Sequence, residues 1–285
     1  MALKETGRWL AKKAARRVTV FGSGHVRKIR GESGRTSVRV LTYHRFVDAE
    51  RGRYSVPPVA FEEQMSWLSE QGLAVSLAQV ERFVSGHDEL KEGSILVTID
   101  DSSLSAYTHA APVLKRYNIP SVAYVATANV GKARSDYDTP EPCMTWDQLA
   151  ELQESGIEIG SHGHSHRAFA LLSEGEQRTE AERSKELLQA RLGRECSSFS
   201  FPAGTRAHSS RTVRRVLRET GYRSAFTNVH GNLHTGMDAL LLPRVKIEGG
   251  ESLWMFQQMV QGGMDAWRFV DGTLAAVARA RSLAG

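Results

Sequence analysis

Residues 94–127 read SILVTIDDSSLSAYTHAAPVLKRYNIPSVAYVAT, a stretch that holds one complete strand–helix–strand unit. The runs 94–101 and 121–127 are short and rich in β-branched residues, and the helical stretch 104–117 separates them. The Asn-Ile-Pro sequence at 118–120 is typical of a helix end that leads into a strand. Two strands joined by a helix pair in parallel, so this unit predicts an α/β fold.

The same alternation continues through most of the chain. Further β-rich runs lie at 38–44, 157–162, 198–202, 222–227 and 241–247, and helical stretches lie at 61–71, 145–154, 174–192 and 210–220. Seven strands separated by helices predict a (β/α) barrel or a doubly wound sheet. Both folds gather reactive side chains at the carboxyl ends of their strands.

The charge of the chain is concentrated near the N-terminus. Residues 1–35 carry ten Lys and Arg and only two Glu, whereas the other 250 residues are slightly acidic, with 27 basic and 30 acidic side chains. A domain that binds nucleic acid carries its positive charge on the folded face that meets the phosphates. The acidic body therefore argues against a nucleic-acid partner.

The basic N-terminal stretch predicts a short amphipathic helix over residues 3–21, followed by a linker rich in Gly, Ser and charge. We expect residues 1–35 to form this arm and linker, and residues 36–285 to form the catalytic domain. Two interpretations of the arm stay open at this level. It is either a solvated helix that packs loosely on the body, or a helix within residues 1–30 that lies on an anionic membrane surface.

The sequence also bears on the location of the protein. It contains no run of 18 apolar residues, and its N-terminus lacks the apolar stretch of a signal peptide. The two cysteines, Cys143 and Cys196, form no disulfide framework and no Cys-x-x-Cys pair. These features predict a cytoplasmic protein, with peripheral association at the inner face of the membrane as a further expectation.

Polar residues follow the predicted strands at the edge where reactive groups collect. His44 ends the first strand, Asp100 and Asp101 end the second, and His162 and His166 follow the fourth. Two adjacent carboxylates at the end of an apolar strand repel each other unless a helix cap, a turn or a cation compensates them. Two histidines and one carboxylate are a common ligand set for a divalent ion, so the pattern favours a metal site.

These motifs carry a family resemblance. The stretches SILVTIDD (94–101), APVLKRYNIP (111–120) and IEIGSHGHSH (157–166) closely resemble the polysaccharide deacetylases of the NodB-homology type, carbohydrate esterase family 4. The resemblance covers about residues 38–250. It implies a distorted (β/α)7 barrel and the metal-dependent removal of an N-acetyl group from an amino sugar. One divalent ion is expected, with zinc favoured.

The resemblance assigns roles to residues of this chain. Asp100 matches the catalytic base, and Asp101, His162 and His166 match the metal ligands. Ala203 lies in a loop whose backbone N–H helps to hold the oxyanion in the family. The first strand, VLTYH (40–44), resembles a subgroup in which the catalytic acid lies near the N-terminus, so His44 is the expected general acid, the alternative being a core histidine.

The sequence also departs from the family pattern. Ser102 replaces the usual Gly after the Asp pair, so a positive φ there would be strained. Gly163 replaces a Ser or Thr, and Ser200 replaces an Arg that orients the catalytic Asp. Arg244 either supplies that guanidinium from a neighbouring strand or forms an ordinary ion pair, and Arg206 is a candidate substrate contact.

The departures at Ser102 and Gly163 leave two alternatives to a sugar N-deacetylase. One is a carbohydrate-binding pseudoenzyme, and the other is a metal-dependent hydrolase that acts on a non-sugar amide. Release of acetate from an N-acetylated sugar would separate them. Because the sequence has no export signal, an intracellular or lipid-linked glycan intermediate is the expected substrate, and an arm on the membrane would bring the enzyme to it. Deletion of residues 1–30 is then expected to spare turnover of a soluble substrate.

Overall fold

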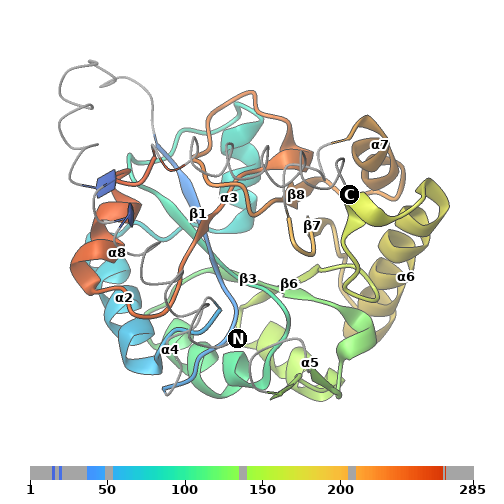
Figure 1. Ribbon diagram of the computed structural model, residues 1–285, viewed down its shortest axis with the longest axis horizontal. Coiled ribbons are helices and arrows are strands. Elements are labelled where there is room, and N and C mark those ends of the chain that lie inside the picture. Colours follow the sequence, from blue (N-terminus) through green and yellow to red (C-terminus); the bar gives the residue numbers. More distant parts are fainter. Residues whose placement is uncertain are drawn as a thin grey trace.

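The computed structural model describes residues 15–16, 19–20, 37–48, 54–134, 140–204, 210–265 and 267. Its centre is a seven-stranded parallel sheet with the strand order β8-β7-β6-β3-β2-β1-β9. The sheet curls into an incomplete barrel (Figure 1). Its strands are β1 (Arg39–Tyr43), β2 (Ile95–Ile99), β3 (Ser121–Val125), β6 (Glu158–Ser161), β7 (Ser198–Ser200), β8 (Ser224–Phe226) and β9 (Val245–Lys246). A separate antiparallel hairpin joins β4 (Ala133–Arg134) to β5 (Glu141–Pro142).

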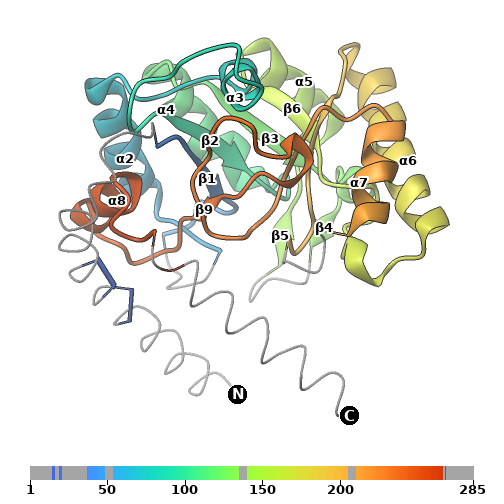
Figure 2. The ribbon, with the colours of Figure 1, turned by 90° about the horizontal axis from the view of Figure 1, so that it is seen from above.

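Helices form an outer ring around the sheet, with α2 and α8 on one side of the molecule and α6 and α7 on the opposite side (Figure 2). The helices are α2 (Pro58–Gln71), α3 (Leu77–Val84), α4 (Ala111–Arg116), α5 (Trp146–Glu154), α6 (Glu174–Leu192), α7 (Arg211–Glu219) and α8 (Leu253–Val260). One π-helical turn, η1 (Ala106–Ala110), leads into α4, and short 3-10 turns lie at Thr127–Asn129, Phe169–Leu171 and Ala239–Leu241.

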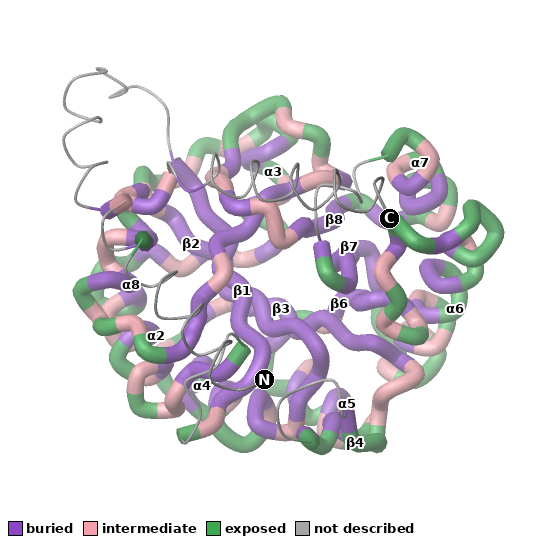
Figure 3. The backbone as a smooth tube through the Cα atoms, in the orientation of Figure 1, coloured by how far each residue is buried: buried purple, intermediate pink, exposed green. Residues whose placement is uncertain are grey.

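The central strands are buried on both faces, as Figure 3 shows. Parallel strands covered by helices read as nearly continuous apolar runs, because neither face meets water. Side chains alternate along each strand. In β2, Ile95, Val97 and Ile99 join the apolar layer under the outer helices, while Leu96 joins a second apolar cluster with residues of β1 and β3. The pattern on β2 therefore directs Asp100, two residues beyond Thr98, to the same face as Leu96.

The predicted fold is confirmed: a curled, parallel, seven-stranded sheet covered by helices. Each of the seven predicted runs contains one strand, and the predicted helix 174–192 coincides with α6. Three elements went unpredicted, namely α3, α8 and the β4–β5 hairpin. Within the described residues, no helix has both the length and the apolar character needed to cross a bilayer.

Candidate active site

The predicted polar residues meet at the carboxyl ends of neighbouring strands. Asp100 follows β2, His44 follows β1 and His162 follows β6. Each of these side chains is at most 5% exposed. The parallel register places Tyr43 beside Ile99, so the ends of β1 and β2 lie level. Strand pairing alone therefore brings residues far apart in the sequence to one edge of the sheet.

Asp100 is the most deeply buried charge at this edge. Its carboxylate is fully enclosed and accepts two hydrogen bonds from the Arg244 guanidinium, at 2.8 Å to Oδ1 and 2.6 Å to Oδ2. Ser200 Oγ donates to Oδ2 at 3.2 Å. Arg244 also donates to Thr98, to the Thr227 carbonyl and to the Asn228 side chain. The guanidinium thus reaches Asp100 from the residue that precedes β9, and Ser200 stands beside it.

These contacts set the charge of Asp100. Burial raises the pKa of the carboxyl, but the charges of Arg244 and His162 and the hydrogen bonds from Arg244 outweigh burial and bring it to about 2. The group is therefore ionised at neutral pH. Two parallel N–H···O bonds also fix its orientation more firmly than a single contact could.

Asp101, His162 and His166 form a compact group of ligand atoms. His162 Nε2 lies 3.3 Å and His166 Nε2 lies 3.0 Å from Asp101 Oδ1, and the three ligand atoms all lie within 4.8 Å of one another. Ligand atoms in a tetrahedral zinc site with bonds near 2.1 Å are about 3.4 Å apart. One carboxylate and two imidazoles at these spacings fit a divalent metal ion with open coordination positions.

The surroundings of His162 also suit metal binding. Its Nδ1 lies 2.7 Å from the Ser200 carbonyl oxygen, which can only accept a hydrogen bond. The Nδ1–H tautomer leaves a lone pair on Nε2, where a metal ion binds. His164 lies outside the group, because its Nδ1 contacts Thr127 Oγ1 at 2.8 Å.

A buried glutamate braces the loop that carries the two histidines. Glu180 of α6 accepts hydrogen bonds from the backbone N–H groups of His164 and Ser165, at 2.8 and 2.7 Å, and from the Ser165 hydroxyl at 2.5 Å. Gly163 has a φ of 74°, and its own N–H donates to Ser161 Oγ at 3.1 Å. The carboxylate of Glu180 therefore stabilises the loop at the place where Gly163 lacks a hydroxyl.

Backbone strain gathers at the same edge. Five described non-glycine residues have positive φ, and four of them belong to these loops: Asp101, Ser102, His166 and Ala203. Ser102 has a φ of 57°, the left-handed conformation in which the sequence predicted strain. Such residues cost about 1–3 kcal/mol each and persist where the surrounding structure fixes them.

His44 lies next to the Asp pair in a closed environment. Its ring packs edge-on against Tyr54, with 5.0 Å between the centroids. Burial, opposed by the charge of Asp101 and assisted by that of Lys246, lowers the pKa of His44 to about 3. Among the described residues, no hydrogen-bond partner reaches Nδ1 of His44. A buried polar atom of this kind is available to a substrate or a bound water molecule.

The loop after β7 is described only in part. Ala203 is exposed, has a φ of 63° and precedes Gly204, whose carbonyl accepts a hydrogen bond from the Asn228 N–H at 2.8 Å. The predicted contact residue Arg206 lies outside the described residues.

Sequence reasoning missed two charged residues of the site, Arg134 and Glu180. Arg134 Nη1 lies 2.7 Å from Asp101 Oδ1. No local pattern identifies Arg134, because β4 has only two residues and follows no periodicity. Glu180 could have been recognised, because it lies with Gln177, Ala181, Ser184 and Leu188 on the buried face of α6. An acid on the buried face of a helix needs a nearby donor or cation.

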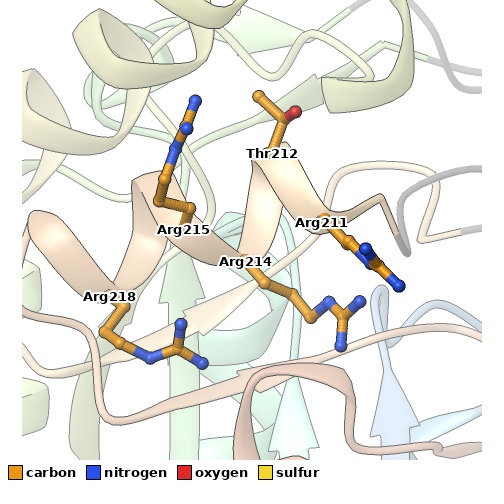
Figure 4. A pocket seen from close by; sticks show the side chains of 5 residues that line it. All are labelled: Arg211, Thr212, Arg214, Arg215 and Arg218. Atoms are coloured by element: carbon orange, nitrogen blue, oxygen red, sulfur yellow. The ribbon is translucent and has the colours of Figure 1, made fainter.

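A surface hollow also lies along α7, lined by Arg211, Thr212, Arg214, Arg215 and Arg218 (Figure 4). Arg214 pairs with Asp238 at 2.8 Å, and Arg215 pairs with Glu174 at 2.6 Å. Carboxylates thus offset part of the positive charge, and the hollow shares no residue with the Asp–His–His group.

The fold and the site place the protein among the (β/α) barrels that carry an Asp–His–His centre at the carboxyl edge of the strands. Comparison with known proteins narrows this class. Residues 87–225 match the family model for polysaccharide deacetylase, and the fold matches that of solved deacetylase structures.

Relatives at low identity extend along most of the chain. YxkH of Bacillus subtilis is 26% identical over 214 residues, which cover 75% of this chain and 72% of YxkH. The poly-beta-1,6-N-acetyl-D-glucosamine N-deacetylase of Escherichia coli K12 is 26% identical over 265 residues. That match covers 77% of this chain but 38% of the longer enzyme.

Solved structures share the fold. IcaB from Ammonifex degensii superposes with a TM-score of 0.69 at 28% identity, and the match covers 79% of this chain and 97% of IcaB. The deacetylase PplD of Streptococcus pyogenes gives a TM-score of 0.70 at 22% identity, with 79% of this chain and 99% of PplD covered. The similarity to PplD supports the fold alone.

Proposed function

We propose that this protein removes the N-acetyl group from an amino sugar in a glycan or glycoconjugate and releases acetate. The observation that carries the proposal is a buried, arginine-held carboxylate, Asp100, directly beside the compact group of Asp101, His162 and His166. The match to the polysaccharide deacetylase model and the N-deacetylase named among the relatives support the sugar amide as the substrate class.

The proposed chemistry divides among residues of the site. A divalent metal ion, zinc as the first candidate, would be held by Asp101, His162 and His166 and would supply Lewis acidity toward the acetyl carbonyl. Asp100 is ionised and accepts the proton of the attacking water molecule. The Ala203 N–H donates a hydrogen bond to the oxyanion that develops on the carbonyl oxygen.

His44 donates a proton to the leaving nitrogen, so that acetate and a free amine separate. Because its pKa is about 3, the imidazole is neutral at pH 7, and the proton that Asp100 takes from the attacking water must pass to it before it can protonate the leaving nitrogen. In its protonated form it is then a strong acid, which suits transfer to an amine.

Acetate release tests the proposal. The full chain is incubated with zinc and β-1,6-linked N-acetylglucosamine oligomers, and acetate and free amines are measured. Asp100→Asn should reduce turnover by about 10²–10⁴-fold while it retains bound metal. Asp147→Asn, at an exposed position in α5, should keep the wild-type rate. Wild-type turnover by Asp100→Asn would refute the assignment of the base.

The assay also separates the competing functions. A carbohydrate-binding pseudoenzyme would bind the oligomer without release of acetate, and the strained Ser102 is the observation that favours it. A hydrolase for non-sugar amides would release acid only from other amides.

We further propose a cytoplasmic location, with residues 1–30 associating with an anionic membrane and with no nucleic-acid partner. The basic composition of residues 1–35 supports the association. Cell fractionation tests the location, and sedimentation with anionic vesicles at low and high salt tests the association. Recovery of the native protein outside the cytoplasm would contradict the location.

A further inference from the structure

The β4–β5 hairpin brings a buried cation to a proposed metal ligand. The Arg134 side chain is 5% exposed, and its Nη1 lies 2.7 Å from Asp101 Oδ1. The same oxygen faces His162 Nε2 and His166 Nε2 at 3.3 and 3.0 Å. The guanidinium therefore contacts the oxygen that would bind the metal ion. Arg134 and the metal ion would thus share one carboxylate, that of Asp101.

The second contact of Arg134 concerns the tautomer of a metal ligand. Arg134 Nη2 lies 3.4 Å from His166 Nδ1. A guanidinium has donors and no acceptor, so this contact requires a lone pair on Nδ1 and a hydrogen on Nε2. Metal binding through Nε2 requires the opposite tautomer. His162 differs, since its Nδ1 faces a carbonyl oxygen, which favours the tautomer with a lone pair on Nε2.

The hairpin holds Arg134 next to a second carboxylate. Glu141 on β5 is the antiparallel partner of Arg134, and directly opposite residues project from the same face of a hairpin. Glu141 is itself fixed, because its Oε1 accepts a hydrogen bond from the Ser105 N–H at 3.2 Å. The Met144 N–H donates to the Ser102 carbonyl at 2.9 Å, so the hairpin region is tied to the loop that carries Asp101.

We propose that Arg134 competes with the metal ion for Asp101 and His166, and that metal binding displaces the guanidinium toward Glu141. Arg134 is thus a positioning residue that sets the metal affinity of the site below the value that its three ligands would give alone. This inference rests on the proposed function, because it takes Asp101, His162 and His166 as the ligands.

Zinc titration tests the competition. Apparent zinc affinity is measured at pH 7 and fixed ionic strength against a chromophoric chelator for wild type, Arg134→Gln and Arg134→Lys. Loss of the charge in Arg134→Gln should tighten binding at least tenfold, whereas Arg134→Lys should stay near wild type. Arg167→Gln is the matched control, because Arg167 is an exposed cation on the same loop as His166 and pairs with Glu176. Arg167→Gln should leave the apparent zinc affinity unchanged.

A second measurement follows the tautomer directly. Nitrogen-15 shifts of His166 in wild type should report the hydrogen on Nε2 without zinc and on Nδ1 with zinc. In Arg134→Gln the Nε2–H tautomer should lose part of its preference before zinc is added, because only the Asp101 carboxylate then favours it. A merely structural role of Arg134 would leave this equilibrium unchanged.

The possible outcomes separate the two proposals. If wild type binds zinc and Arg134→Gln binds it equally or more weakly, the competition is refuted and the proposed metal centre stands. If Arg134→Gln binds zinc and wild type does not, the competition is supported in its strongest form. If no variant binds zinc, the metal centre and the competition both fail.

Discussion

Ser102 illustrates, at the scale of single residues, how this site departs from what its sequence prefers. A side chain in the left-handed region costs about 1–2 kcal/mol, because its Cβ approaches the following carbonyl oxygen. Ser102 holds a φ of 57°, and its hydroxyl finds no hydrogen-bond partner among the described residues. The backbone strain at Ser102 is therefore not offset by a hydrogen bond of its hydroxyl within the described residues.

Replacement of Ser102 by Gly should raise the free energy of unfolding. Relief of about 1–2 kcal/mol of strain exceeds the roughly 0.4–1 kcal/mol that glycine loses through the greater freedom of the unfolded chain. We expect a net gain of about 0.5–1 kcal/mol in urea denaturation. Ser85→Gly is the control, because Ser85 has a φ of −77° and the same change should destabilise. Destabilisation by Ser102→Gly would contradict the strain argument.

Asp100 and Arg244 yield a prediction about pH. The pKa of Asp100 in the folded protein is about 2, below its unfolded value near 3.9. The group therefore contributes stability above about pH 4, and this contribution is lost as the pH falls toward 2. Its size is about 2–3 kcal/mol. Urea denaturation from pH 7 to pH 2 should show the decline.

Substitution of Arg244 tests the origin of that decline. Arg244→Met leaves a buried carboxylate without its cation and should cost about 3–5 kcal/mol at pH 7. Burial then raises the pKa of Asp100, so its contribution changes sign and favours low pH. The double variant with Asp100→Asn should recover most of the loss. If the free energy of unfolding of Arg244→Met falls in parallel with that of wild type as the pH is lowered, the Asp100–Arg244 pair does not set the pKa of Asp100.

Site residues differed in how far the sequence predicted them. Asp100, Asp101, His162 and His166 were predictable, because strand ends collect at one edge and because the motif resembles a known family. The sequence left two roles open for Arg244. Its contact with Asp100 spans the sheet from the residue before β9, and no local sequence pattern predicts such a contact. Arg134 could not be identified from the sequence, since a single arginine in a two-residue strand carries no periodic signal.

Among the elements, α6 contributes more to the site than its surface position suggests. It begins with a capping box at Ser173 and Glu176 and directs Glu180 toward the loop that carries His162 and His166. Outer partners of this kind hold metal ligands in place, and their loss typically costs about 10–100-fold in metal affinity.

Glu180→Gln should therefore weaken zinc binding by about 10–100-fold, because the amide cannot accept from three donors as the carboxylate does. Chelator competition measures the affinity, and circular dichroism checks that α6 persists. Glu186→Gln, at an exposed position of the same helix, should bind zinc like wild type. Equal zinc affinity of Glu180→Gln and Glu186→Gln would show that Glu180 does not support the loop that carries the two histidines.

The secondary structure was predictable in proportion to its regularity. The strands and the long helix α6 follow clear periods, and their positions agree with the structure. Helix α3 carries a capping box at Ser76 and Gln79 that the sequence displays. The π-helical turn η1 replaces part of the predicted helix 104–117, and the two-residue strands β4 and β5 depend on tertiary contacts that no local pattern contains.

At the scale of the whole molecule, part of the basic N-terminal segment contacts the body. Arg16 is 3% exposed, and its Nη1 lies 2.7 Å from Glu251 Oε1 and 3.3 Å from Glu248 Oε2. Val20 is buried in the main apolar cluster. Arg16 is thus one basic residue of the segment that a membrane surface cannot reach in this arrangement. The division at residue 35 stays a prediction.

Arg16→Met should lower the free energy of unfolding by about 3–5 kcal/mol, because it removes a buried guanidinium that pairs with the carboxylates of Glu248 and Glu251. Adding Glu251→Gln should restore part of the loss. Arg183→Met, at an exposed position of α6, should change stability by less than about 0.5 kcal/mol. Deletion of residues 1–30 should destabilise like Arg16→Met, so turnover should be compared below the melting transition of each protein. Unchanged stability of both Arg16→Met and the deletion variant would show that the contact of Arg16 with the body is dispensable.

The contact of Arg16 also bears on how the chain folds during its synthesis. Arg16 donates to Met259 Sδ across a sequence separation of 243 residues, and β9 pairs with β1 from a similar distance. The ribosome must therefore make nearly the whole barrel before either contact can form. Until then one edge of β1 has no neighbouring strand, and an unpaired strand edge is the feature that other nascent chains and chaperones recognise.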